Sequence, residues 1–292
     1  MKSILPAVLL IAMLLPPAAL GADESVAITP DVVYGHKDGM ALTFDVLKPK
    51  ENANGAGVLF MVSGGWYSHW FPPQHAVGTF KPLLDAGFTV FVVRHGSSPK
   101  YVVPEAVEDV RRSVRVIRQR ARQFGVDPDR LGVTGGSAGG HLSLILGTTA
   151  DAGDPQAGDE VLRQSSRVAA VVAYYPPTDL REFVQEDSWY YEKFPALRFD
   201  PARADACSPL LQVTDDDAPT LLVHGDKDEL VPLDHSEKIL AALQKVKVPC
   251  ELLVVEGAAH GFSGDDGRRA GEAMVAWFQK HLGKPAATKR EP

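Results

Sequence analysis

The sequence predicts an α/β fold with a mainly parallel sheet and helices on both of its faces. Short, continuously apolar runs alternate with longer segments whose apolar residues recur at helical spacing. Strands that are apolar throughout are typical of parallel sheets that are buried on both faces. The chain has 292 residues, 45% of them hydrophobic and 23% charged, which suits one large domain. The net charge of −7 is modest, and no basic cluster indicates a nucleic-acid partner.

The first 22 residues differ in composition from the rest of the chain. Lys2 gives a positive start, an apolar run broken by prolines follows, and small residues stand at Gly21 and Ala22. This order is typical of a cleaved secretory signal peptide. The alternative is an uncleaved anchor, but the apolar run is shorter than the roughly 20 residues that a spanning helix needs. We therefore expect a secreted or periplasmic protein without stable membrane insertion.

The expected elements begin with a hairpin, because the turn signal Lys37-Asp38-Gly39 separates two alternating runs. Six further strands are expected at residues 57–64, 88–96, 130–136, 168–176, 219–225 and 250–258. Helices are expected between them at residues 75–87, 104–125, 138–150, 233–246 and 269–282. The pattern therefore predicts eight strands that alternate with helices after the hairpin.

Two segments interrupt this alternation. Residues 150–166 are polar and predict a loop or a short helix, whereas residues 180–210 form a longer insertion rich in aromatic residues. No repeat or linker divides the chain, so we expect one domain over residues 23–284. The tail at residues 285–292 is expected to be disordered.

The most informative motif is Gly135-Gly136-Ser137-Ala138-Gly139, which fits G-x-S-x-G between a predicted strand and a predicted helix. In such a tight turn the serine takes a strained backbone conformation and its hydroxyl projects above the sheet. Glycines flank it because neighbouring backbone passes too close for a side chain. The alternative is an ordinary glycine-rich loop. The placement between strand and helix favours Ser137 as a nucleophile.

A serine nucleophile needs a histidine to accept its proton and a carboxylate to hold that histidine. His260 is the preferred base because it follows the last predicted strand, at the sheet edge where sites assemble. Asp226 and Asp228 both follow the strand at residues 219–225, and position alone does not separate them. Asp179 is expected to cap or orient a loop.

Four other histidines compete with His260 for the role of base. His224 lies at the end of a strand and is expected to be packed or hydrogen-bonded. His141 lies one helical turn after Ser137 and is expected to support the turn rather than act as base. His69 and His75 lie in a loop that borders the expected pocket, where a non-catalytic role is favoured.

The negative oxygen of a tetrahedral intermediate needs preorganised N–H donors. Ala138 supplies one at the start of its helix, where backbone N–H groups are unpaired. The segment Ser63-Gly64-Gly65-Trp66 follows a strand, and its two glycines allow further N–H groups to point inward. Elsewhere, Cys207 and Cys250 permit one disulfide or two separate thiols, and no catalytic role is assigned to either.

Together these residues resemble the α/β-hydrolase fold, with its eight-stranded, mainly parallel sheet. More narrowly, the chain resembles secreted bacterial carbohydrate esterases of the feruloyl and acetyl esterase types and hormone-sensitive-lipase-like esterases. The resemblance covers roughly residues 40–282. It rests on the motifs VLFMVSGGW, PEAVEDV, FGVDPDRLGVTGGSAGGHLSLILG, YYPPTD, PTLLVHGDKDELVPLDHS and VVEGAAHGF, in that order.

The resemblance implies Ser137 as nucleophile, His260 as base and Asp228, the second aspartate of its motif, as the acid. It further implies Gly64 and Gly65 as oxyanion donors beside Ala138, when the family's HGGGW segment is aligned on its tryptophan. This chain departs from that segment because Val62 and Ser63 replace the leading His-Gly. The missing histidine normally braces the loop.

The expected function is hydrolysis of carboxylic esters, without a metal or another cofactor, on a small-molecule or carbohydrate ester. Trp66 and two residues of the insertion, Trp189 and Tyr190, are expected to contact the substrate; the alternative is that the insertion's aromatic residues form a small core of their own. Two rival functions are a prolyl-oligopeptidase-like peptidase and a non-catalytic protein that keeps the fold. The sequence does not define the oligomeric state or the acyl and alcohol groups.

Overall fold

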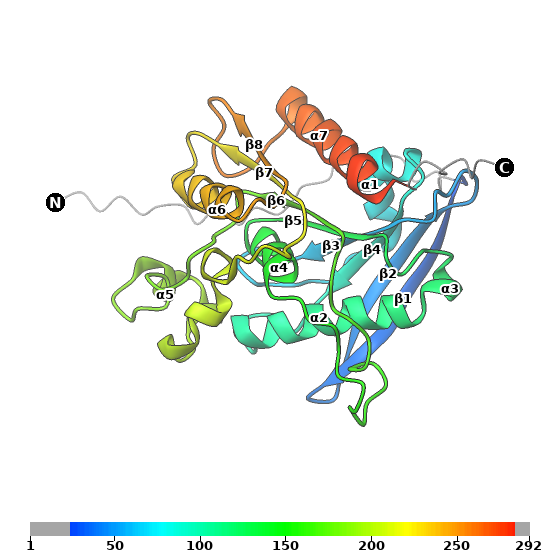
Figure 1. Cartoon of the computed structure of the whole chain (residues 1–292), viewed down its shortest axis with the longest axis horizontal. Helices are drawn as coiled ribbons and strands as arrows, with labels where there is room; N and C mark the ends of the chain where they lie inside the picture. The colour runs from blue at the N-terminus through cyan, green and yellow to red at the C-terminus, as the bar shows by residue number, and fades with distance from the viewer. Residues whose placement is uncertain (1–23, 284–292) are drawn as a thin grey trace.

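The computed structural model describes residues 24–283. The expected signal peptide at residues 1–22 and the expected tail at residues 285–292 lie outside the described residues. Within the described range the chain folds around one eight-stranded sheet with helices on both faces (Figure 1). The predicted fold class, an α/β-hydrolase sheet of eight strands, is confirmed.

The sheet has the strand order β1-β2-β4-β3-β5-β6-β7-β8. Its strands are β1 (Val26–Lys37), β2 (Met40–Pro49), β3 (Gly57–Val62), β4 (Thr89–Arg94), β5 (Leu131–Gly136), β6 (Ala170–Tyr174), β7 (Thr220–Gly225) and β8 (Cys250–Val255). The β1–β2 and β2–β4 pairs are antiparallel, and all later pairs are parallel. The carboxyl ends of β3 to β8 therefore meet at one edge of the sheet, where the predicted site residues follow them.

Helices lie on both faces of this sheet. They are α1 (Pro73–Asp85), α2 (Val103–Gln119), α3 (Ala121–Phe124), α4 (Ala138–Thr148), α5 (Trp189–Lys193), α6 (Asp234–Lys245) and α7 (Gly264–Leu282). Figure 1 shows α1 and α7 on one side of the sheet and α2 and α4 on the other. The apolar residues form two corresponding clusters, one under α1 and α7 and one under α2, α4 and α6. Burial on both faces explains why the central strands are apolar throughout.

The predicted hairpin is confirmed, and its turn explains the residues found there. Asp38 and Gly39 both have positive φ, 49° and 79°, between the antiparallel strands β1 and β2. Two-residue turns with positive φ at both positions match the twist of the strands, and they favour Asp-Gly.

Some element boundaries differ from the prediction. The helix expected at residues 104–125 breaks at Arg120, and the short α3 then carries Phe124 against the rings of Phe44 and Phe91. The final helix begins at Gly264, five residues earlier than predicted, and two aspartates in its first turn suit the positive end of the helix dipole. Residues 150–166 form turns and no helix.

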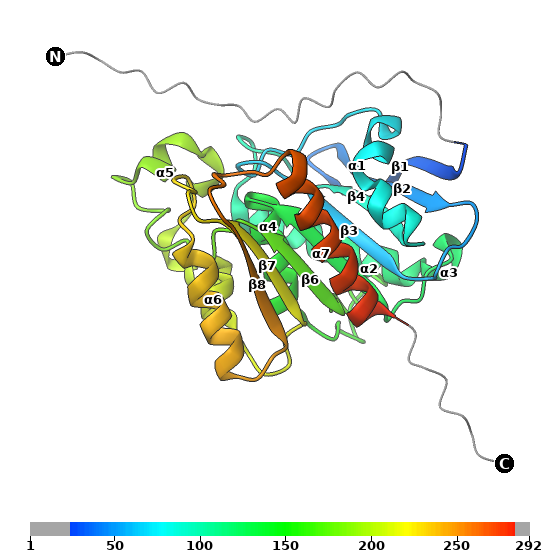
Figure 2. The same cartoon turned by 90° about the horizontal axis from the view of Figure 1, so that it is seen from above.

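The insertion between β6 and β7 contains α5 and four short 3₁₀ segments: η1 (Pro195–Leu197), η2 (Pro201–Arg203), η3 (Asp205–Cys207) and η4 (Pro209–Gln212). Figure 2 shows α5 and its neighbours at one end of the molecule, with the β1–β2 hairpin at the other. The insertion is therefore a compact extension beside the strand ends rather than a separate domain.

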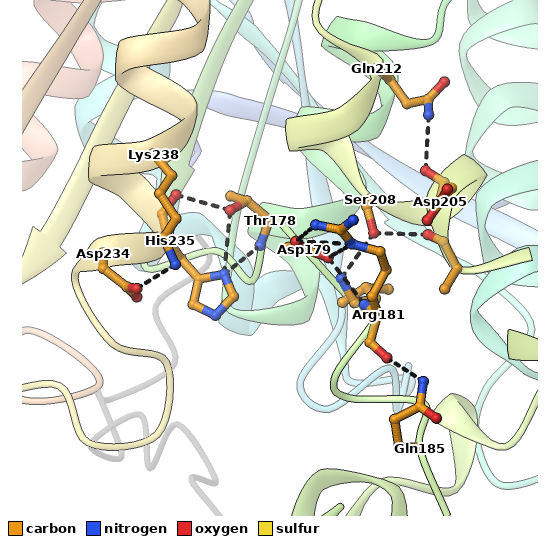
Figure 3. Close-up of polar contacts among 12 residues, drawn as sticks. Thr178, Asp179, Arg181, Gln185, Asp205, Ser208, Gln212, Asp234, His235 and Lys238 are labelled. Carbon is orange, nitrogen blue, oxygen red and sulfur yellow. Dashed lines mark hydrogen bonds and ion pairs between the residues drawn. The ribbon is translucent and has the colours of Figure 1, made fainter.

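The base of the insertion is fastened by hydrogen bonds (Figure 3). The Leu180 N–H donates to the Ser208 hydroxyl at 2.9 Å, and the Leu210 N–H donates to the Thr178 carbonyl at 3.0 Å. Thr178 also donates its N–H to Nδ1 of His235 on α6 at 3.1 Å. These bonds join the two ends of the insertion to each other and fix its first end to α6.

Candidate active site

Ser137 stands at a strained turn between β5 and α4. Its φ is 55° and its ψ is −120°, a conformation that a residue with a side chain rarely adopts. A Cβ at Gly135 would lie 2.6 Å from the backbone of Gly139, and a Cβ at Gly139 would lie 2.7 Å from the Met61 carbonyl oxygen. Glycine is required at both positions for steric reasons, as the sequence predicts.

His260 and Asp228 come together across the carboxyl ends of β7 and β8. Nδ1 of His260 lies 2.7 Å from Oδ2 of Asp228. A carboxylate accepts hydrogen bonds, so Nδ1 carries the proton and Nε2 keeps its lone pair. The other carboxylate oxygen, Oδ1, accepts the N–H groups of Leu230 and Val231 at 3.0 and 2.9 Å. The imidazole is therefore held in the tautomer that a general base requires.

The carboxyl group of Asp228 is held in its ionised form. Burial raises its pKa, but hydrogen bonds from His224, His260 and the Val231 N–H outweigh that effect and hold the pKa well below the ordinary range. Nε2 of His224 lies 3.3 Å from Oδ2, so a second buried imidazole faces the same oxygen. An ionised Asp228 stabilises an imidazolium that forms at His260.

The structure separates the two aspartates that position alone left open. Asp226 accepts the Gly257 N–H at 2.6 Å, on the turn after β8, whereas Asp228 contacts His260. His224 is fully buried between the Ser236 hydroxyl and the Val231 carbonyl, at 2.7 and 2.8 Å, as a packed, hydrogen-bonded histidine. Asp179 caps the loop before the insertion by accepting the Arg181 N–H and binding its guanidinium.

Tyr175 links the serine turn to His260, and the sequence reading missed it. The centroid of its ring lies 4.6 Å from that of the His260 ring, and a Cβ at Gly136 would lie 2.9 Å from its hydroxyl oxygen. Burial, with a smaller effect from Asp228, raises the pKa of Tyr175 to about 12, so the phenol is neutral. Its φ is 36°, an unusual backbone value inside the YYPPTD motif that no local pattern predicts.

The turn that carries Ser137 and the imidazole of His260 both lie against Tyr175. No hydrogen bond joins them among the contacts of residues 24–283. Such bonds are often long in enzymes without substrate and shorten when the substrate binds. The structure thus shows the strained serine and the oriented imidazole as two separate parts.

The expected oxyanion donors have different surroundings. Ala138 is the first residue of α4, where an N–H has no acceptor within its own helix. Gly65 has a φ of 56° and lies in the loop after β3, facing the same cavity as Ser137. The Gly64 N–H instead donates to the Tyr67 carbonyl at 3.0 Å. The expectation that Gly64 is a donor is not met, because its N–H already has an acceptor.

Trp66 and His141 join the loop after β3 to α4. The Trp66 indole N–H points at Nδ1 of His141 at 3.3 Å, and Nε2 of His141 contacts the Cys207 carbonyl at 2.7 Å. His141 is fully buried, and burial lowers its pKa to about 4. It therefore supports the turn as a neutral group, in keeping with its expected structural role. The thiols of Cys207 and Cys250 are free, so the disulfide that the sequence permits is not formed.

A small cavity opens beside the Ser137 hydroxyl. Its volume is about 20 Å³. Its other lining residues come from the loop after β3, the insertion and the loop after β7: Gly65, Trp66, Pro177, Phe183, Tyr190, Phe194, Leu230 and Val231. A cavity of this size holds a group about as large as one water molecule.

The insertion's aromatic residues divide between packing and exposure. Phe183 and Tyr190 stack with ring centroids 3.8 Å apart, and the Tyr190 hydroxyl donates to the Leu230 carbonyl at 2.9 Å. The ring of Phe194 lies so close to Gly65 that a Cβ there would be 2.8 Å away. Trp189 is half exposed and contacts both Tyr190 and Phe194 edge-on. The rings pack together, as the alternative expects, and Trp66 and Tyr190 line the cavity whereas Trp189 does not. Contact of these residues with a substrate stays a prediction.

Across residues 24–283, no cluster of three or more His, Cys, Asp or Glu side chains is placed to hold a metal ion. Over the same range, no helix combines the length and apolar character needed to cross a bilayer.

The fold and this arrangement of residues place the chain in the α/β-hydrolase class. The BD-FAE family model matches residues 44–243, and the chain belongs to this family. It is 27% identical to the probable carboxylic ester hydrolase LipM of Mycobacterium tuberculosis over 89% of this chain and 62% of that protein. It is 30% identical to esterase LipQ of the same organism over 75% of this chain and 53% of that protein. The chain thus spans about half to three-fifths of their length.

A solved structure described as a truncated form of carbohydrate esterase from gut microbiota superposes with a TM-score of 0.74. The two sequences are 25% identical, and the match covers 90% of this chain and 99% of that one. These two relatives and this solved structure are all described as ester hydrolases or esterases, the class of protein that the sequence predicts.

Proposed function

We propose that this protein is a serine hydrolase that cleaves carboxylic esters, with Ser137 as nucleophile, His260 as base and Asp228 as the acid of the triad. The observation that carries the proposal is the 2.7 Å contact between Asp228 and Nδ1 of His260, together with the strained turn that carries Ser137 at the carboxyl end of β5 in the same sheet. The esterase relatives support the reaction class.

In the first half of the reaction, Oγ of Ser137 attacks the ester carbonyl carbon while Nε2 of His260 accepts the hydroxyl proton. The carbonyl oxygen becomes negative and accepts hydrogen bonds from the N–H groups of Gly65 and Ala138. Asp228 stabilises the imidazolium. When the tetrahedral intermediate collapses, the C–O bond to the alcohol breaks and His260 gives its proton to the departing oxygen. The acyl group remains on Ser137.

In the second half, water replaces the alcohol. Nε2 of His260 accepts a proton from the water, whose oxygen attacks the acyl carbon. The second tetrahedral intermediate is stabilised by the same two N–H donors. It releases the carboxylic acid, and the proton returns from His260 to Ser137.

The cavity beside Ser137 supports esters with a short acyl group as the substrates. The departing alcohol must lie beside His260, which protonates it, and neither His260 nor Tyr175 lines this cavity. Gly65 lines the cavity instead, so the cavity receives the acyl group. With room for little more than one water molecule, it favours the smallest acyl groups, such as acetyl. An acetylated carbohydrate outside the cell is the natural substrate that we propose, on the N-terminal pattern and the carbohydrate-esterase relative.

The test is the substitution Ser137→Ala with p-nitrophenyl acetate as substrate. We expect wild-type protein to release p-nitrophenol and the variant to lose at least about 10⁴ in kcat, because the acyl-enzyme cannot form. A fluorophosphonate probe should label wild-type Ser137 and leave the variant unlabelled. An unlabelled wild type would favour a non-catalytic protein, and cleavage of a chromogenic dipeptide without ester cleavage would favour a peptidase.

A further inference from the structure

The oxyanion loop, residues 63–68, holds a strained turn whose conformation needs support. Gly65 and Trp66 have φ values of 56° and 60°, a backbone conformation that is strained for a residue other than glycine. Such a turn persists only where its surroundings fix it. In related segments the support comes from a leading histidine, and in this chain Val62 occupies that position and packs in the apolar cluster under α1.

A different pair of polar side chains stands at the start of this loop. In the parallel pairing of β3 and β4, Val62 lies opposite Arg94, so the next residues, Ser63 and His95, leave the sheet side by side. Oγ of Ser63 lies 2.9 Å from Nε2 of His95. The two residues are 32 positions apart in the chain and meet only because of the strand register.

The direction of this hydrogen bond follows from the other contact of the ring. Nδ1 of His95 lies 2.9 Å from the Gly96 carbonyl oxygen, which can only accept, so Nδ1 carries the proton. Nε2 therefore accepts the hydrogen bond that the Ser63 hydroxyl donates. His95 is 4% exposed, and burial lowers its pKa to about 4, so the ring is neutral at ordinary pH.

Ser63 connects this histidine to both parts of the site. Its carbonyl accepts the Gly139 N–H at 3.2 Å, on the first turn of the helix that follows Ser137. Its chain continues into the loop that presents Gly65. A shift of Ser63 would therefore move the Gly65 donor relative to the serine turn.

The segment that follows β4 holds the far end of the loop. The Ser98 N–H donates to the Trp66 carbonyl at 3.0 Å, and the Ser68 N–H donates to the Ser97 hydroxyl at 2.9 Å. The His95 N–H donates to the Ser68 hydroxyl at 3.3 Å. The oxyanion loop is thus anchored to residues 95–98 at both of its ends, with His95 contacting each end.

We infer that Ser63 and His95 are positioning residues that fix the Gly65 N–H for the oxyanion, in place of the histidine that Val62 replaces. The inference rests on the proposed function of the neighbouring site. Because the oxyanion forms only in the transition state, loss of the hydrogen bond between Ser63 and His95 lowers kcat and leaves KM nearly unchanged.

The test compares Ser63→Ala with Ser63→Thr, which keeps the hydroxyl. We expect kcat for p-nitrophenyl acetate to fall about three- to tenfold in Ser63→Ala, with KM within about twofold, and to recover in Ser63→Thr. Ser113→Ala is the matched control, because that buried hydroxyl donates only within α2, to the Val110 carbonyl at 2.7 Å. Its kcat should equal that of the wild type.

A double-mutant cycle with His95→Leu tests whether the pair acts through its mutual bond. We expect the double variant Ser63→Ala/His95→Leu to lose no more kcat than His95→Leu alone. Additive losses would overturn the inference. So would an unchanged kcat in Ser63→Ala, a loss that Ser63→Thr does not reverse, or an equal loss in Ser113→Ala.

Hydrogen exchange gives a readout that does not depend on activity. The amides of residues 64–68 should exchange faster in Ser63→Ala than in wild type and in Ser113→Ala, because the strained turn opens more often. Unchanged exchange would overturn the inference even if the wild type proved inactive. Loss of ester cleavage in the wild type, with faster exchange in Ser63→Ala, would reject the proposed function alone.

Discussion

At the scale of single residues, the site depends on contacts that fix protonation and backbone strain. Asp228 accepts hydrogen bonds from Nδ1–H of His260 and from two backbone N–H groups, which keep its carboxylate ionised and correctly oriented. Asp226, only two positions away, serves a turn instead. Two chemically identical side chains therefore have different roles, which their contacts decide.

This difference predicts the effect of removing each charge. In Asp228→Asn the amide does not stabilise the imidazolium and does not fix the required tautomer, so we expect kcat to fall by roughly 10³–10⁴. Steady-state kinetics with p-nitrophenyl acetate provide the measurement. Asp226→Asn is the matched control and should stay within about threefold of wild type. Comparable losses in both variants would contradict the assignment of Asp228.

At the scale of elements, two segments shape the space around Ser137. The turn from β5 to α4 is so tight that Gly135 and Gly139 touch, and the insertion brings the Phe194 ring against Gly65. In the proposed reaction, the first contact positions the nucleophile, and the second limits the room for the acyl group. Each of these two contacts predicts the outcome of one substitution.

We expect Gly135→Ala to destabilise the fold, because its Cβ would meet the Gly139 backbone at 2.6 Å. Overpacking of this kind typically costs about 1–3 kcal/mol, which urea unfolding would measure. Gly78→Ala on α1 is the control: its Cβ would meet nothing within 4 Å, and alanine favours a helix by up to about 1 kcal/mol. Equal stability of the two variants would show that the turn is looser than the structure indicates.

Removal of the Phe194 ring should enlarge the acyl space. We expect Phe194→Ala to raise kcat/KM for p-nitrophenyl hexanoate relative to the acetate by about tenfold or more, since each buried methylene contributes about 0.8 kcal/mol. Tyr191→Ala is the control, because that ring lies on the same insertion, packs on Arg198 and does not line the cavity. An unchanged ratio in Phe194→Ala would place the acyl group elsewhere.

At the scale of the whole molecule, one sheet gathers groups from distant parts of the chain at its carboxyl edge. Buried neutral histidines then connect these parts: His141 joins α4 to the loop after β3 and to the insertion, and His95 joins β4 to the same loop. A neutral histidine in the interior resists protonation. The stability of the whole fold should therefore depend on pH.

Burial lowers the pKa of His95 and of His141 to about 4, from about 6.5 in the unfolded chain. Between these values the unfolded state binds more protons, so the free energy of unfolding decreases as pH falls from 6.5 to 4. Each histidine accounts for about 3 kcal/mol of this loss. Asp228 acts in a lower window, since its lowered pKa stabilises the fold above about pH 4 and that contribution fades below it.

Urea unfolding at several pH values measures this effect. We expect a clear loss of stability in wild type between pH 6.5 and 4 and a smaller loss in His141→Asn, which lacks one of the two groups. A flat profile in wild type, or the same slope in the variant, would show that these histidines are accessible to protons in the folded state.

The order of the elements, the hairpin and the serine turn were predicted from the sequence because each depends on neighbouring residues: apolar spacing, Asp-Gly at a turn, and glycine beside Ser137. The break after α2 was not predicted, because it places Phe124 against the rings of Phe44 and Phe91, which lie far away in the chain. The early start of α7 was missed as well, since Gly264 and Gly267 look like loop residues.

The sequence by itself determined the fold class, and its local pattern and chain order suffice to propose Ser137 as nucleophile and His260 as base. Only the tertiary structure decided which N–H groups are free, what holds the oxyanion loop and how small the cavity is. The Gly64 contact with Tyr67, the Tyr175 contact with His260 and the Ser63 contact with His95 depend on turn geometry and strand register. Such contacts leave no local pattern in the sequence, because the two partners are far apart in the chain or joined by a turn. The register of the strands and the conformation of the turn decide whether they meet.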